Sequence, residues 1–133
     1  GAGRGAGGGR GRGGPGAPGR ERREVRVQVR TATPRVSGYL SAEQIMRVVR
    51  RNFAQVRYCY ENELQRQPNL GGRIEIRWRV ARNGTVSSAR VGSSSLRNAR
   101  VEGCIVRQVR RWRFPEPDGG EVDVNFPFIL GAG

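Results

Sequence analysis

Residues 100–115 read Arg-Val-Glu-Gly-Cys-Ile-Val-Arg-Gln-Val-Arg-Arg-Trp-Arg-Phe-Pro, and this stretch decides the fold. Side chains of one face recur in it at spacings of three and four, which is the period of an amphipathic helix. That face consists of Val101, Cys104, Ile105, Gln108, Val109 and Trp112. Pro115 lacks a backbone N–H and stops the helix, so Trp112 and Phe114 anchor its C-terminal end. Asn98 is expected to cap this helix, which needs an apolar surface to lie on.

A longer helix is predicted between Ser41 and Gln67. The sequence Ser41-Ala-Glu-Gln44 forms a capping box at its start, and Pro68 with the following Gly-Gly pair ends it. The apolar face of this helix consists of Ile45, Val48, Val49, Phe53, Val56, Tyr60 and Leu64. Cys59 lies at the edge of that face, so both predicted helices carry a cysteine close to the core.

Four stretches alternate apolar and polar residues, which is the pattern of half-buried strands. They are residues 24–33, 73–82, 85–93 and 121–130. Asn83-Gly84 predicts a hairpin between the second and the third. Pro127 lacks a ladder donor, so we expect the last strand at an edge of the sheet, with the first hairpin strand at its centre.

The order of elements predicts a two-layer α+β domain, with two helices packed on a small antiparallel sheet. The order is α-β-β-α-β with an extra N-terminal strand. We divide the chain into a disordered linker (1–22), an N-terminal strand segment (23–38) and the domain itself (39–130). Whether the N-terminal strand covers a sheet edge is left open.

The formal net charge is +14, all 25 cations are arginine, and there is no histidine. Residues 1–35 hold nine of the arginines and two of the acids, so the folded part is only moderately basic. Residues 1–22 consist mainly of glycine and arginine and cannot bury enough apolar surface to fold. They contain no aromatic residue for stacking on bases, which favours a linker over a nucleic-acid-binding tail. We interpret the chain as a piece of a longer protein, since it has no start methionine and no signal-peptide pattern.

Cys59 and Cys104 are the only cysteines. A disulfide between the two helices is favoured over two buried free thiols, and both interpretations stay open at this point. Two thiols without histidine fall short of a zinc site, and no Cys-x-x-Cys redox motif is present. Without histidine, and without paired carboxylates near a nucleophile, we predict no enzyme, no metal and no cofactor.

Five segments together resemble the C-terminal domain of TonB-like energy transducers. More narrowly, they are similar to the AgmX/PglI type of gliding myxobacteria, which carries this pair of cysteines. The segments are Val-Arg-Tyr-Cys-Tyr-Glu (56–61), Asn-Gly-Thr-Val-Ser-Ser-Ala-Arg-Val (83–91), Val-Glu-Gly-Cys-Ile-Val (101–106), Arg-Arg-Trp-Arg-Phe-Pro (110–115) and Val-Asn-Phe-Pro-Phe (124–128). The resemblance covers about residues 38–130.

The resemblance implies a periplasmic domain at the C-terminal part of an inner-membrane-anchored protein. Its partners would be inner-membrane motor proteins, reached through the missing N-terminal part, and an outer-membrane or periplasmic protein segment. TonB binds such a segment by pairing its last strand with it, which agrees with the edge expected from Pro127. The predicted partner-binding edge is therefore Glu121, Val122, Asp123, Val124, Asn125 and Phe126.

The motor-coupling function is expected to involve no nucleic acid. Two alternatives to it remain. One is a basic nucleic-acid-binding module that uses the Arg/Gly tail and the hairpin arginines Arg73, Arg77 and Arg79, although such a row is more often a solvated face. The other is a structural domain that binds peptidoglycan or forms a homodimer through the same edge.

Overall fold

The computed structural model describes residues 27–31 and 35–132, so the predicted linker at 1–22 lies outside it. In chain order its elements are β1 (Val27–Thr31), β2 (Arg35–Ser37), α1 (Ala42–Arg51), α2 (Phe53–Leu64), β3 (Gly72–Val80), β4 (Val86–Ser94), α3 (Ala99–Val109) and β5 (Val122–Ala132). The order follows the predicted α-β-β-α-β pattern with N-terminal strand segments in front, except that the first predicted helix is divided into α1 and α2. The predicted strand at 24–33 is described only as β1, and the short β2 was not expected.

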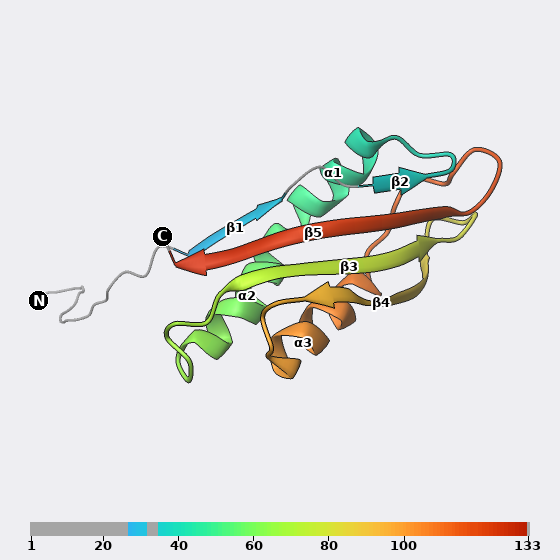
Figure 1. Cartoon of the computed structure of the whole chain (residues 1–133). Helices are drawn as coiled ribbons and strands as arrows, with labels where there is room; N and C mark the ends of the chain where they lie inside the picture. Colours follow the sequence, from blue (N-terminus) through green and yellow to red (C-terminus); the bar gives the residue numbers. More distant parts are fainter. Residues whose placement is uncertain (1–26, 32–34, 133) are drawn as a thin grey trace, which may run out of the picture.

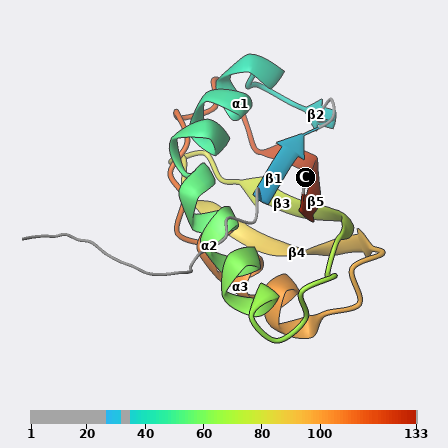
Figure 2. The same cartoon turned by 90° about the vertical axis from the view of Figure 1, so that its left-hand side faces the viewer.

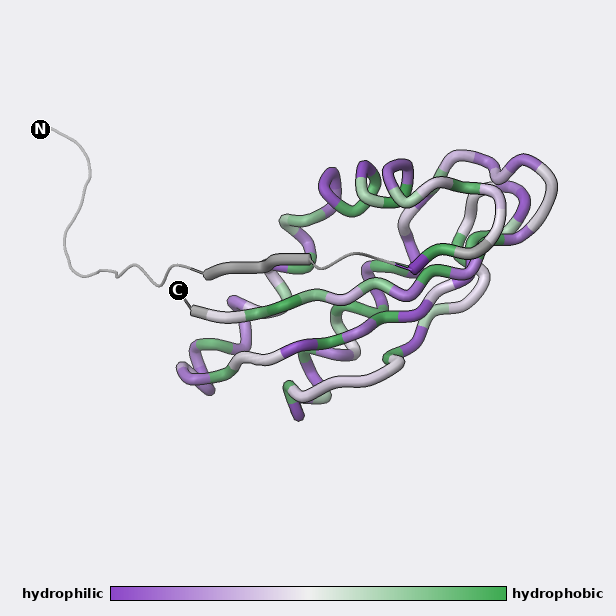
Figure 3. Tube along the Cα trace, turned by 45° about the horizontal axis from the view of Figure 1, so that its top comes forward, coloured by the Kyte–Doolittle hydropathy of each residue, from purple (hydrophilic) through white to green (hydrophobic). Residues whose placement is uncertain are grey.

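The described strands form one antiparallel sheet in the order β1-β5-β3-β4, and β2 pairs with β5 beyond the end of β1. Figure 1 looks onto the face of the sheet that the helices leave open, and Figure 2 shows α1, α2 and α3 together on the other face. The predicted two-layer α+β class is therefore confirmed. The tube along β3 in Figure 3 alternates between hydrophilic and hydrophobic residues, as a sheet with one covered face requires.

The expected edge position of the last strand is wrong. β5 pairs with β3 from Val122 to Leu130, and on its other side it pairs with β2 and β1. Even-numbered residues of β5 bond to β3, so the missing N–H of Pro127 faces the other side of the strand. There the ladder to β2 ends with the pair Arg35–Asn125, and the ladder to β1 begins with the pair Thr31–Phe128. Pro127 lies in the gap between these two ladders, so an interior strand accommodates it.

The long helix predicted from Ser41 to Gln67 is two helices. The capping box is present: the Ser41 hydroxyl accepts from the Gln44 N–H, and the Gln44 side chain accepts from the Ser41 N–H. The first helix ends at Asn52, whose Nδ2 donates to the carbonyl of Val48 at 2.9 Å. This side-chain bond to a carbonyl of the same helix competes with continuation of that helix, and α2 starts at the residue after Asn52.

The helix predicted from residue 100 begins as expected but ends early. Asn98 caps it, with its Oδ1 accepting from the Val101 N–H at 2.9 Å, and α3 ends at Val109, well before Pro115. The chain then turns so that Trp112 meets Trp78 of β3 edge-on, with ring centroids 5.9 Å apart. The predicted anchoring by aromatics is present, but it comes from the turn after the helix.

Candidate partner-binding surfaces

The two cysteines join α2 to α3. Cys59 and Cys104 form a disulfide with their Cα atoms 5.7 Å apart, and Cys59 is only 3% exposed. A second link lies beside it, where the Asn98 side chain donates to the carboxylate of Glu63 at 3.1 Å. Disulfides persist in oxidising compartments, so this bond favours a location outside the cytoplasm.

The predicted partner-binding residues do not form an open edge. Glu121 comes directly before β5, and the other five lie within it. Val122, Val124 and Phe126 are buried against the helices. Asp123 and Asn125 point to the open face, but their backbone groups face β2 and are paired there. In the structure this edge is occupied by the chain's own residues.

In the part of the chain that the structure describes, one edge of the sheet is the outer side of β4, and the opposite edge is formed by β1 and β2. The carbonyl of Arg73 accepts from the Ser95 N–H, so odd-numbered residues of β3 bond toward β4. Arg90 pairs with one of these odd-numbered residues. Its neighbours Ala89 and Val91 therefore direct their N–H and C=O groups away from the sheet. No strand pairs with these groups in the part of the chain that the structure describes.

One side chain reaches this outer side. Nη2 of Arg110, at the C-terminal end of α3, donates to the carbonyl of Ala89 at 3.2 Å. This contact satisfies one outward acceptor and shows independently that the Ala89 carbonyl points outward. The alternating pattern of residues 85–93 predicts the β4 strand itself but not its edge position, because no local signal reveals which of several strands lies at an edge.

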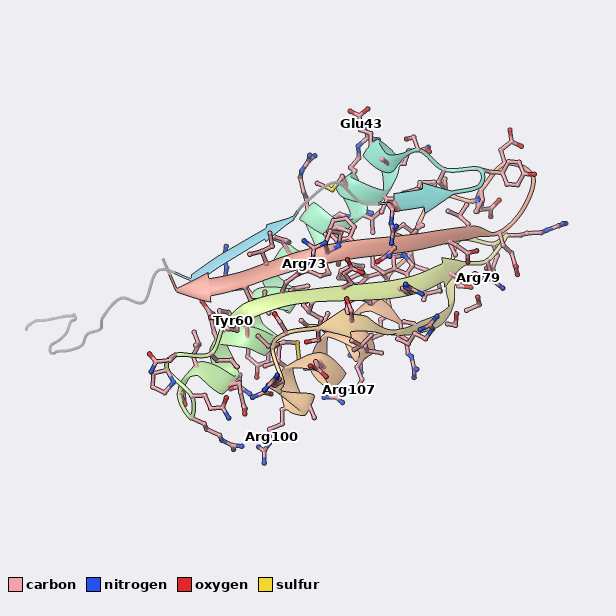
Figure 4. All side chains as sticks on the ribbon, in the orientation of Figure 1. Glu43, Tyr60, Arg73, Arg79, Arg100 and Arg107 are labelled. Atoms are coloured by element: carbon pink, nitrogen blue, oxygen red, sulfur yellow. A yellow bond between two sulfur atoms is a disulfide. The ribbon has the colours of Figure 1, made fainter. Side chains whose placement is uncertain are left out.

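The open face of the sheet carries the hairpin arginines. Arg79 binds Asp123 of β5 through two bonds, of 2.7 and 3.3 Å, and it lies near the end of β3 in Figure 4. Arg73 donates to Glu75 at 3.0 Å, and this bond is the main reason why the pKa of the Glu75 carboxyl lies below its ordinary value. Two of the three arginines are therefore held by acids of the same face, in agreement with the solvated face favoured for this row.

Within residues 27–31 and 35–132 no helix is long and apolar enough to cross a membrane. The same residues contain no group of three or more His, Cys, Asp or Glu side chains arranged to hold a metal ion.

The comparisons with known proteins give one distant similarity. The chain is 29% identical over 89 residues to "Tyrosine-protein kinase MasK" of Myxococcus xanthus. The aligned residues cover 67% of this chain and 14% of that protein. No family model matches the chain, and no solved structure matches it. Protein kinases require a lysine for the nucleotide phosphates and a His-Arg-Asp loop for the catalytic base, whereas this chain has neither lysine nor histidine. The match thus spans a small part of that longer Myxococcus protein, and this chain lacks the lysine and the histidine of the kinase motifs.

Proposed function

We propose that this chain is a TonB-like domain of the bacterial envelope that binds an extended segment of a partner along the outer side of β4. In this function it couples an inner-membrane motor to outer-membrane proteins, as part of gliding motility. The observation that carries the proposal is the row of outward backbone groups at Ala89 and Val91, which face no other described strand.

The composition of β4 suits strand addition. Natural sheets protect free edges with proline, lysine, inward-pointing charges or β-bulges, and a stretch of edge without these is a template for another strand. The register of β4 against β3 shifts near both of its ends, which leaves residues 88–91 as the regular stretch. β4 reads Val-Ser-Ser-Ala-Arg-Val-Gly-Ser-Ser, with no proline and with Arg90 as its one charged residue. Main-chain hydrogen bonds to an added strand would supply affinity there, and alternate side chains would supply specificity.

The binding edge proposed here differs from the one that the TonB resemblance implies. In this chain β2 and β1 lie along β5, so a partner cannot pair with that strand unless these segments leave it. β4 forms the opposite edge of the sheet and needs no such rearrangement. Among the described residues, the Arg110 side chain must yield its contact with Ala89.

Two further observations support the location and the role. The disulfide fits an oxidising compartment such as the periplasm, where a cross-link between α2 and α3 resists unfolding under load. The similarity to part of a longer Myxococcus protein agrees with the myxobacterial type named by the sequence resemblance. Motor coupling and gliding rest on that resemblance alone.

The test is site-specific photo-crosslinking in the native organism. A photoreactive residue at Ser93, on β4, should give an adduct with one envelope protein, and the same residue at Arg47, on α1, should not. Val91→Pro removes an outward N–H and should abolish both the adduct and motility. Val91→Ala keeps that N–H and should retain them.

Thermal melts must show that both Val91 variants are folded, because Val91 also packs against the core. A folded Val91→Pro variant that still forms the adduct would rule out pairing at β4. An adduct from Arg47 alone would place the partner on the helical face instead.

A further inference from the structure

The register of the sheet places three arginines in one transverse line. Arg90 of β4 is opposite Arg77 of β3, Arg77 is opposite Asn125 of β5, and Asn125 is opposite Arg35 of β2. Directly paired residues project from the same face, so all four side chains belong to the open face seen in Figure 1. Strands are about 4.8 Å apart, so the line is about 14 Å long. We call these four residues the arginine row.

The arginine row has no internal charge compensation. Like charges directly opposite each other destabilise a sheet, and Arg77 opposite Arg90 is such a pair. The nearest acids of the face are engaged by other arginines, Asp123 by Arg79 and Glu75 by Arg73. Within the described part of the chain neither Arg77 nor Arg90 forms an ion pair or donates a side-chain hydrogen bond. Their guanidinium donors therefore remain available to a ligand.

Arg77 has a place prepared for its side chain. A Cβ atom added to Gly92 would lie 2.8 Å from Nε of Arg77 and 3.0 Å from its Cγ, so the arginine stem crosses β4 where Gly92 leaves room. The irregularity in the β3–β4 register between Glu75 and Ile76 places Gly92 at this point. A hollow of about 460 Å³ lies over the face, and all four residues of the arginine row line it.

We infer that the arginine row is a binding site for a short acidic peptide segment that lies across the strands, with its carboxylates on Arg35, Arg77 and Arg90. Guanidinium groups bind carboxylates in a planar, bidentate manner, which suits this ligand. The inference does not depend on strand pairing at β4.

The surroundings of the row favour an acidic peptide over a phosphate polymer. Glu75 and Asp123 lie two residues from the row along their strands, on opposite sides of it, and each is paired with an arginine. The uncompensated positive charge is therefore confined to the row, and it matches a short segment across the strands better than a long polyanion along them. Nucleic-acid surfaces also present aromatic side chains for base stacking. The exposed large aromatics of the described residues, Tyr39 and Tyr58, do not line this hollow.

The experiment is an NMR titration of the full chain with a capped hexapeptide of alternating glutamate and serine. Backbone shifts should change along β4, β3 and β5 around the arginine row, and a matched glutamine–serine peptide should cause no change. Raising the salt from 50 to 300 mM, values chosen to bracket the screening range, should weaken binding several-fold, because the contacts are ionic and exposed.

Variants test the named residues. Arg77→Gln combined with Arg90→Gln should weaken the acidic peptide at least ten-fold, whereas Arg47→Gln and Arg100→Gln, on the helices, should leave the affinity within two-fold. Val91→Pro should also leave it unchanged, which separates this site from pairing at β4.

Four results would overturn the inference. The first three are equal binding of the glutamine peptide, unchanged affinity in the Arg77/Arg90 double variant, and shift changes outside the arginine row only. A hexameric oligothymidylate that binds the same residues more tightly than the acidic peptide would assign the site to phosphates and would equally refute it.

Discussion

Breaking the Cys59–Cys104 bond will destabilise the domain by about 4 kcal/mol. The bond closes a loop of 45 residues. In the chain-entropy description, opening such a loop returns about 13 cal/mol/K to the unfolded chain, which is about 4 kcal/mol at 25 °C. Small domains are stable by roughly 5–15 kcal/mol in total, so this bond is a large share of the stability.

Urea unfolding with and without reductant measures this difference. Trp78 and Trp112 pack together in the core, so their fluorescence reports the loss of tertiary structure. With an m-value of about 1.5 kcal/mol/M, the midpoint should fall by roughly 2.5 M on reduction. The m-value itself should rise, because the unfolded chain without the cross-link exposes more surface.

The matched control is the double variant Cys59→Ala with Cys104→Ala. Its midpoint should equal that of the reduced protein to within about 0.5 M and should not respond to reductant, since each alanine differs from a reduced cysteine only by the loss of one sulfur atom. A midpoint shift below about 0.5 M, in protein whose disulfide is verified by intact mass, would refute the loop-entropy argument. Free thiols in protein isolated from its native compartment would instead refute the inferred location.

Three further predictions concern the fold and the open face. Tyr60→Phe should lower the free energy of unfolding by about 1–3 kcal/mol in urea, because the buried hydroxyl donates to a backbone carbonyl that would lose its partner. Gly84→Ala should lower the melting temperature by about 10 °C, since Gly84 has φ 86° and a Cβ there would collide with the Phe114 carbonyl. The pKa of Glu75 should lie below its ordinary value in a carboxyl NMR titration and should rise in Arg73→Gln. Its contribution to stability is then present above the unfolded pKa of about 4.3 and is lost as the pH falls through the lower folded pKa.

Local chemistry made the helix starts and the hairpin predictable. The capping box at Ser41, the cap at Asn98 and the turn at Asn83-Gly84 depend on residues within a few positions of each other, and each is present. The break at Asn52 is also local, but the apolar pattern continues across it into α2, so periodicity alone predicts one helix.

The sheet edges were not predictable in the same way. Which strands lie at the edges depends on where β1 and β2 dock, and these short segments lie 86 to 105 residues before their partners in β5. Pro127 does lack a ladder donor, as expected. The prediction of a free edge at β5 was wrong, because the missing donor lies opposite the gap between β1 and β2. In this sheet Pro127 therefore marks a break in one ladder and not an edge of the sheet.

The two proposed surfaces meet at Arg90. This residue lies on β4, whose outer side is free in the described residues, and it is also the last member of the arginine row on that side. A strand added to β4 would place one of its own side chains beside Arg90, as the next member of the row. An acidic side chain at that position of the partner would form an ion pair with Arg90, since the arginine row itself contains three arginines, one asparagine and no acid. Main-chain pairing would then hold any extended segment, and Arg90 would select those with an acid in register, so a single partner chain can use both surfaces.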